Sequence, residues 1–179
     1  CKKKRTSMKD CFCVSMGSCF IRIRSKRMEK MRSDLEHDVG RAIKLEREAY
    51  DLYMELLGKS KTRNTQDLFS EFAKQELKHE SLLKAFLQFE DFEKAKKRIK
   101  AEFEGFCAIG DRIDPSEDTR SVLEGFELAI DQERKAQRLY KELLEDADDD
   151  QVIELFKALL KEEVEHELLL KGEHDKLFG

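Results

Sequence analysis

Two copies of a Glu-x-x-His motif are the residues of this chain best suited to chemistry. Glu76 and His79 form the first copy, and Glu163 and His166 form the second. Residues three positions apart in an α-helix lie on neighbouring turns of one face, so each motif places a carboxylate beside an imidazole. Both groups are ligands for divalent transition metals. A single such motif in a charged helix is common by chance and is more often a solvent-exposed pair, so more than the motif is needed to predict a metal site.

The two motifs belong to an internal repeat with an offset of 87 residues. Between positions 41 and 84, 19 of 44 residues are identical to the residue 87 positions later, and Glu46 is thereby paired with Glu133. Two of the four histidines of the chain occupy the same register of this duplicated unit, which makes chance a poor explanation of the motif. The other two, His37 and His174, lack such partners, and we expect them at the surface.

The repeated glutamates interrupt apolar helix faces. Ala42, Ile43 and Ala49 share one face with Glu46, and the other three repeated glutamates have similar neighbours. Four carboxylates in an apolar core, with no Lys or Arg on the same faces, would be strongly destabilising or would take up protons. We therefore predict that cations lie among them. The six residues expected to face this core are Glu46, Glu76, His79, Glu133, Glu163 and His166.

Four glutamates and two histidines from four helices are the ligand set of a carboxylate-bridged centre of two metal ions. Carboxylate and imidazole suit two iron ions or two manganese ions equally, so the donor set leaves both metals open. Tyr53 and Tyr140 lie seven residues after Glu46 and Glu133 on the same faces, where a hydroxyl can hydrogen-bond a ligating carboxylate. The alternative is that both tyrosines are core aromatics whose hydroxyls are satisfied elsewhere.

Four amphipathic helices must position these residues. We expect helices at about 33–58, from 65 to beyond 87, at 116–146 and at 149–177. The loops near 59–64 and 146–150 are short enough to make neighbouring helices antiparallel. Residues 90–114 form a long crossover, which contains the helical pattern FEKAKKRIKAEFEGF. We therefore predict an all-α four-helix bundle built from two duplicated helical hairpins, and a hairpin pair that dimerises to complete a bundle is the structural alternative.

The composition agrees with long helices in a single domain. The chain has 179 residues, of which 41% are charged, with a single proline and no Trp. Residues 1–30 carry ten Lys and Arg against Asp10 and Glu29, a formal charge of +8 that leaves -12 for the remainder. The acidic body argues against nucleic-acid binding, which needs Lys and Arg at the phosphates, and suits a protein that attracts cations.

We divide the chain into a basic leader, residues 1–30, and a bundle domain, residues 31–179. The chain begins with Cys1, and Met28 and Met31 precede the first helical pattern, so we expect the leader to be disordered, or to be an upstream or expression-derived segment. Its cationic residues can contact an anionic membrane, but it lacks a clear amphipathic helix. Four of the five cysteines lie in the leader without the spacing of a disulfide framework, and we expect a reduced, cytoplasmic protein.

At the repeated residues the sequence resembles the rubrerythrin branch of the ferritin-like superfamily and, more distantly, bacterioferritin. The resemblance covers about residues 34–178 and rests on EREAYDLY (46–53), ELKH (76–79), ERKAQRLY (133–140) and EVEH (163–166). It implies a ferritin-like fold in which two glutamates bridge the metals and two are terminal ligands. By this resemblance the bridging residues are Glu76 and Glu163, the terminal carboxylates are Glu46 and Glu133, and the imidazoles are His79 and His166.

The family typically reduces hydrogen peroxide or dioxygen with electrons from a redox partner. Many members carry a rubredoxin module with two CxxC pairs; this chain has no CxxC, so the resemblance implies a separate electron-donor protein such as a rubredoxin. Ala136 stands where rubrerythrins usually have an additional glutamate, which implies a more symmetric site that is closer to bacterioferritin.

Our leading hypothesis is a di-iron oxidoreductase that reduces hydrogen peroxide, or that consumes dioxygen while oxidising ferrous iron. We expect it to form a homodimer. An iron-handling or iron-storage protein of the ferritin-like type and a metal-free structural bundle stay open as alternatives.

Overall fold

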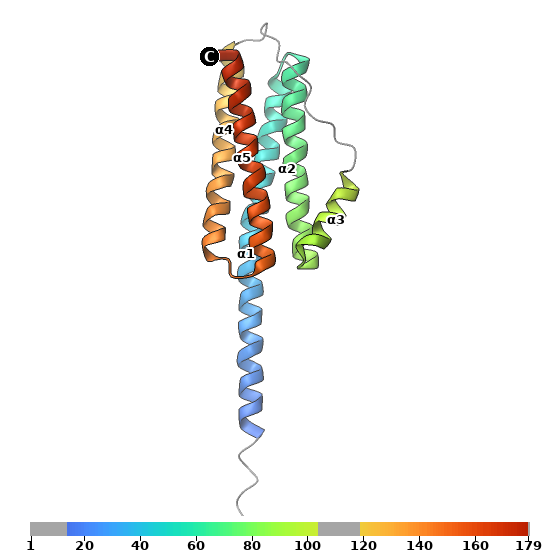
Figure 1. Cartoon of the computed structure of the whole chain (residues 1–179), viewed down its shortest axis with the longest axis vertical. Coiled ribbons are helices and arrows are strands. Elements are labelled where there is room, and N and C mark those ends of the chain that lie inside the picture. Colours follow the sequence, from blue (N-terminus) through green and yellow to red (C-terminus); the bar gives the residue numbers. More distant parts are fainter. Residues whose placement is uncertain (1–13, 104–118, 179) are drawn as a thin grey trace, which may run out of the picture. The chain divides into compact units, whose positions relative to one another are not determined.

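Helices account for all the regular secondary structure in the computed structural model, which describes residues 14–103 and 119–178 (Figure 1). The five helices are α1 (Val14–Lys59), α2 (Arg63–Phe89), α3 (Phe92–Glu102), α4 (Thr119–Asp146) and α5 (Asp150–Phe178). The chain divides into two units, Cys1–His37 and Asp38–Gly179, and the second unit holds α2 to α5 together with the rest of α1. The predicted all-α architecture is therefore confirmed.

Helix α1 begins at Val14, well before the start near Ser33 that the sequence predicts. No proline lies between these two residues, and a single glycine in a helix interior costs only about 1 kcal/mol. Arg32 and Glu36, which lie one helical turn apart on either side of the expected N-cap, form an ion pair with 3.1 Å between Arg32 Nε and Glu36 Oε1. Residues 14–30 of the expected leader are therefore helical, whereas residues 1–13 lie outside the described residues, so the extent of the leader stays a prediction.

Side-chain caps set the starts of three of the helices. Thr62 precedes α2, and its Oγ1 accepts a hydrogen bond from the Thr65 backbone N–H at 3.3 Å. Asp91 does the same for α3 by accepting from the N–H of Lys94 at 2.9 Å, and Asp149 caps α5. These caps satisfy backbone donors that have no partner within their own helix. Because two of the caps lie in the short connections after α1 and α4, they fix the two hairpins that the sequence predicts.

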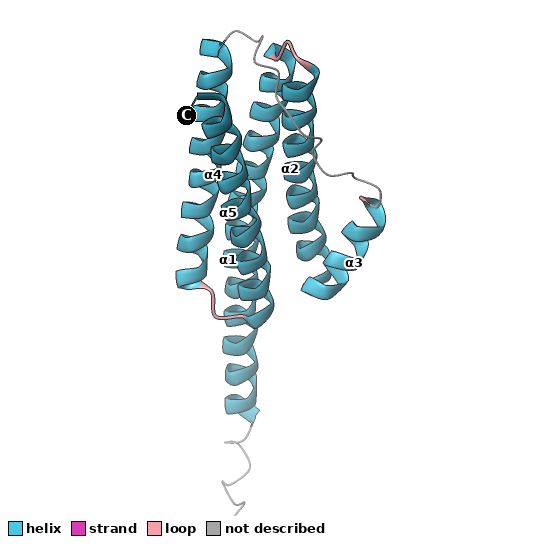
Figure 2. Cartoon of the chain, turned by 45° about the horizontal axis from the view of Figure 1, so that its top comes forward, coloured by secondary structure: helices cyan, strands magenta, loops and turns pink. Residues whose placement is uncertain are grey.

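One apolar core joins the second part of α1 to α2, α4 and α5. These four helices run alongside one another, and α3 packs on the outside against α2 and α5 (Figures 1 and 2). At Gly125 an added Cβ would lie 3.2 Å from Leu56 Cδ2, so a glycine here lets α4 approach α1 closely. Buried core residues come from every one of the four helices, among them Tyr53, Leu68, Phe69, Phe72, Phe126, Ala129 and Leu170.

None of the helices that the structure describes is both long enough and apolar enough to span a bilayer.

Candidate metal centre

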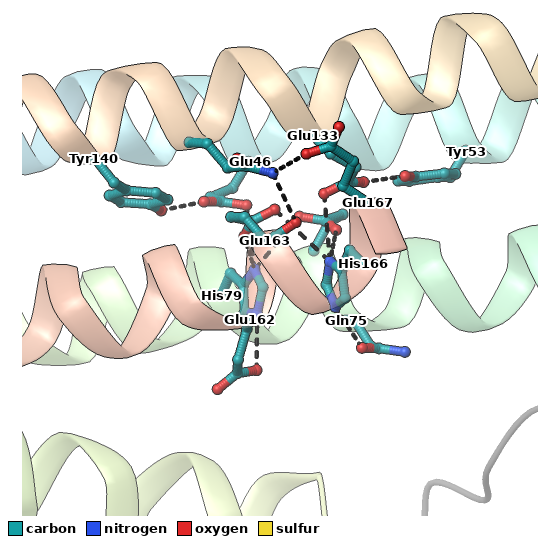
Figure 3. Close-up of polar contacts among 12 residues, drawn as sticks. Glu46, Tyr53, Gln75, His79, Glu133, Tyr140, Glu162, Glu163, His166 and Glu167 are labelled. Atoms are coloured by element: carbon teal, nitrogen blue, oxygen red, sulfur yellow. Dashed lines mark hydrogen bonds and ion pairs between the residues drawn. The ribbon is translucent and has the colours of Figure 1, made fainter. Parts of the chain in front are cut away.

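The six residues that the sequence expects to face a common core lie together inside the bundle. Figure 3 labels all of them except Glu76. Helices α1 and α4 each contribute one glutamate, and α2 and α5 each contribute one Glu-x-x-His motif. All six side chains are buried, with exposed fractions between 0% and 5%. The helices position them because each lies on the same helix face as the large apolar residues that fill the core.

The cluster divides into two groups of four residues. Within each group, one potential ligand atom per residue lies within 4.8 Å of the others. The first group is Glu46, Glu76, His79 and Glu163, and the second is Glu76, Glu133, Glu163 and His166. Glu76 and Glu163 belong to both groups, which is the arrangement that two neighbouring metal ions bridged by two carboxylates require.

Each imidazole turns its Nδ1 toward the glutamates. His79 Nδ1 lies 2.8 Å from Glu163 Oε1, and His166 Nδ1 lies 3.3 Å from Glu76 Oε1. The two rings stack almost in parallel, with centroids 5.4 Å apart and an angle of 11° between their planes. Both histidines therefore present the same nitrogen to the same space.

The outer nitrogen of each imidazole has its own hydrogen-bond partner. His79 Nε2 lies 3.0 Å from Glu162 Oε2, and His166 Nε2 lies 2.6 Å from Gln75 Oε1. Burial opposes ionisation of Glu162, but the hydrogen bond and charge of His79 and the nearby Lys78 lower its pKa to about 2, so it is a carboxylate at neutral pH. Both outer partners accept hydrogen bonds, which places the proton on Nε2 and leaves Nδ1 as the nitrogen for a metal ion.

Two buried tyrosines tie the two halves of the site together. The Tyr53 hydroxyl donates to Glu133 Oε1, and the Tyr140 hydroxyl donates to Glu46 Oε1. Each tyrosine therefore holds the glutamate of the other repeat rather than the one on its own helix (Figure 3). The second carboxylate oxygen of each of these glutamates is left to face the cluster.

Unpaired polar atoms converge in the middle of the cluster. Among the described residues, seven buried atoms of the six side chains lack a hydrogen-bond partner of suitable geometry. They are Glu46 Oε2, both carboxylate oxygens of Glu76, His79 Nδ1, Glu133 Oε2, Glu163 Oε1 and His166 Nδ1. Each unsatisfied buried polar group costs about 1–3 kcal/mol, and all seven are metal-ligand atoms. The donor set therefore fits a pair of divalent transition-metal ions.

Comparison with known proteins agrees with this geometry. A family model described as Rubrerythrin matches residues 39–174, which include all six residues of the cluster and most of the bundle. The chain belongs to the rubrerythrin family. Neither the comparison with curated proteins nor that with solved structures gives a significant match. The family resemblance predicted from the sequence is confirmed, and the bundle is the ferritin-like fold of that family.

Without a cation, the buried cluster of this rubrerythrin perturbs its own pKa values. Burial, followed by the charge of neighbouring carboxylates, raises the pKa of Glu46 and of Glu133. Burial also opposes ionisation of Glu76 and Glu163, but hydrogen bonds and charge from the two histidines outweigh it and lower both pKa values. The imidazole pKa values are raised, because the surrounding carboxylates outweigh burial. The raised imidazole pKa values beside the lowered pKa values of Glu76 and Glu163 favour imidazolium–carboxylate pairs in the metal-free cluster.

The sequence did not predict two ion pairs that lie beside the centre, one in each half of the repeat. Arg47 Nη2 lies 2.5 Å from the buried Glu80 Oε2, and Arg134 Nε lies 2.8 Å from Glu167 Oε1. Both residues of each pair are among the identities of the repeat, so the repeat was the signal that could have revealed them. Each glutamate directly follows a histidine of the cluster, and each arginine directly follows a glutamate of it. These pairs therefore link α1 to α2 and α4 to α5 next to the site.

The remaining two histidines lie outside the cluster. His37 is exposed, and His174 is half-buried near the C-terminal end of α5 with its ring edge toward Phe126. Neither takes part in the two groups of potential ligands.

Proposed function

We propose that this member of the rubrerythrin family is a di-iron oxidoreductase that reduces hydrogen peroxide, or that reduces dioxygen while oxidising ferrous iron. The observation that carries the proposal is the pair of four-residue groups that share two carboxylates inside the bundle. Glu76 and Glu163 would bridge the ions. The terminal ligands would be Glu46 and His79 on one side and Glu133 and His166 on the other.

The chemistry comes from the metal pair, and the chain supplies its geometry. Two ferrous ions, when bound, would supply the two electrons that, with two protons, reduce one hydrogen peroxide to two water molecules. Manganese would suit the same donors, and we favour iron because the proposed reaction needs this redox couple.

The chain's own residues hold the ligands and keep bulk water away. Tyr53 and Tyr140 each fix one oxygen of a terminal glutamate, so the other oxygen stays directed at the cluster. The hydrogen bonds on Nε2 fix both imidazole rings. On the histidine side, a surface groove of about 520 Å³ is lined by Gln75, Glu162 and His166, so a small molecule in this groove would lie beside one imidazole of the site.

Electrons would come from a separate protein such as a rubredoxin. We place the reaction in the cytoplasm, because a reducing compartment maintains both ferrous iron and a reduced electron donor. The symmetric site also supports a second candidate function, iron handling or storage: the two groups have the same composition, and Ala136 supplies no additional carboxylate.

Metal analysis tests the site first. The protein purified without chelator and then loaded anaerobically with ferrous iron should hold two ions per chain, and the double variant Glu76→Gln/Glu163→Gln should hold fewer than one. The matched control is Glu55→Gln/Glu142→Gln, which changes two exposed glutamates with the same 87-residue relation and should leave the content at two. A wild-type chain with no more iron than the bridging variant would instead support a metal-free structural bundle.

Stopped-flow oxidation of the loaded protein then separates the two reactions. Faster oxidation by hydrogen peroxide than by dioxygen, with the iron still at two per chain, is the expected result. Preference for dioxygen, with further iron retained on repeated additions, would overturn the peroxidase assignment and support storage.

A further inference from the structure

The two halves of the centre differ in the group behind each imidazole. A shift of 87 residues lays every glutamate and histidine of the cluster on an identical residue, but it lays Gln75 on Glu162. His79 is therefore backed by a carboxylate at 3.0 Å and His166 by a neutral amide oxygen at 2.6 Å (Figure 3). The sequence repeat therefore preserves the six potential ligands but not the residues that hydrogen-bond to the two imidazoles.

A carboxylate behind a histidine makes the imidazole a stronger donor to a metal ion than an amide does. The N–H that points at a carboxylate is more strongly polarised, which raises the electron density at the opposite nitrogen. Loss of such a partner typically lowers metal affinity about 10-fold to 100-fold. The full negative charge also attracts a cation, whereas an amide dipole attracts it only weakly.

We propose that Glu162 makes the half of the centre formed by Glu46 and His79 the tighter one, so that the first divalent ion binds there and the second binds beside His166. This inference rests on the proposed di-metal function. Glu162 is a positioning residue that acts through His79, because it contacts the imidazole and stands outside the two groups of potential ligands.

Lys78 moderates this effect. Its Nζ lies 3.3 Å from the same Oε2 that faces His79, so the carboxylate is shared between an ammonium group and the imidazole. The lysine side chain is 41% exposed, and solvent screens its charge more than it screens a buried contact. The carboxylate therefore keeps its effect on the imidazole, and removal of the lysine should strengthen it.

Other features beside the two imidazoles repeat, or differ without a hydrogen bond to Nε2, such as Lys78, which the repeat lays on Glu165. The tyrosine hydroxyls and the Arg47 and Arg134 ion pairs occur in both halves. Phe72 packs edge-on against His166, with centroids 5.3 Å apart, and the repeat has Leu159 at the matching position, but neither side chain is a hydrogen-bonding partner for Nε2. An exchange of Gln75 and Glu162 therefore isolates the carboxylate from the rest of the asymmetry.

The test is a titration of the full metal-free chain with Zn(II), followed by calorimetry and by ¹⁵N NMR of labelled histidines. In the wild type we expect two binding steps that differ about tenfold or more in affinity, with the His79 signals moving first. Glu162→Gln should close the gap by weakening the first step, and Gln75→Glu should close it by strengthening the second. The double variant Gln75→Glu/Glu162→Gln should restore the gap with His166 moving first.

Two single variants complete the design. Glu165→Gln removes a negative charge from the same groove without a contact to either imidazole, so the wild-type order and gap should persist. Lys78→Gln should widen the gap. The inference is wrong if the wild type fills both halves together, or if the double variant keeps His79 first. A wild-type chain that binds no Zn(II) overturns the proposed di-metal function as well.

Discussion

Raising the pH should destabilise the metal-free bundle while it strengthens metal binding. The pKa values of His79 and His166 are raised above their ordinary 6.5 in the folded chain, so their stabilising contribution is complete below pH 6.5 and is lost as the pH rises through the folded values. The contributions of Glu46 and Glu133 to stability also fall as the pH rises. Their folded pKa values lie above 4.5, so the folded chain binds protons that the unfolded chain has released.

The other two glutamates have the opposite sign in a different pH range. The pKa values of Glu76 and Glu163 are lowered, so their contribution is present above pH 4.5 and is lost only as the pH falls through the folded values. Above pH 6.5 they add no slope. Each proton held only by the folded chain changes the free energy of unfolding by about 1.36 kcal/mol per pH unit. About one pH unit above 6.5, where an unfolded histidine has lost its proton and a folded one with a raised pKa still holds it, the two histidines give a loss of about 2.7 kcal/mol per pH unit.

Urea unfolding of chelator-treated protein at several pH values above 6.5 measures this slope. In the variant His79→Gln/His166→Gln this slope should be smaller by about 2.7 kcal/mol per pH unit. The control His37→Gln/His174→Gln changes the two histidines outside the cluster and should have the wild-type slope. Calorimetry of metal binding in buffers of different ionisation enthalpy counts the same protons, and two to four should be released per pair of ions.

A free energy of unfolding that stays flat or rises across this range would refute the reasoning. It would mean that the metal-free site holds neutral imidazoles and ionised carboxylates, and that something other than protons balances the buried charge. Release of fewer than two protons per pair of ions would lead to the same conclusion.

Three further changes have expected outcomes. Tyr53→Phe leaves Glu133 Oε1 without its donor and should weaken metal binding at least about tenfold, whereas Tyr50→Phe, on the same helix but outside this contact, should not; equal titration curves would contradict this role. Removal of residues 1–30 should leave the metal content unchanged, and a loss of metal would show that the leader helps to build the fold. Leu168 is 63% exposed on α5, and Leu168→Glu should shift the expected homodimer toward monomer in light scattering; an unchanged mass would place the dimer contact elsewhere.

The sequence was sufficient to predict the bundle and to single out the six residues that the structure brings together. Helical periodicity fixes which side chains share a face, so Glu46 with Ala42 and Ala49 had to face the core once α1 formed. The repeat supplied the second half of the cluster in the same register. The start of α1 could not be predicted, because residues 14–33 contain no proline, and the small interior cost of Ser33 and Asp34 does not stop a helix whose preceding turn is already formed.

The tertiary structure alone decided which residues support the six. Tyr53 lies on the same helix face as Glu46, yet its hydroxyl reaches Glu133, and His79 reaches Glu162 on α5 rather than a residue of α2. Periodicity determines the direction in which a side chain leaves its own helix, but the stagger and rotation of the neighbouring helix determine what it meets. Those are set by the packing of the whole core. The 87-residue repeat shows that Gln75 and Glu162 differ, but only the folded chain shows that each lies behind an imidazole of the other repeat.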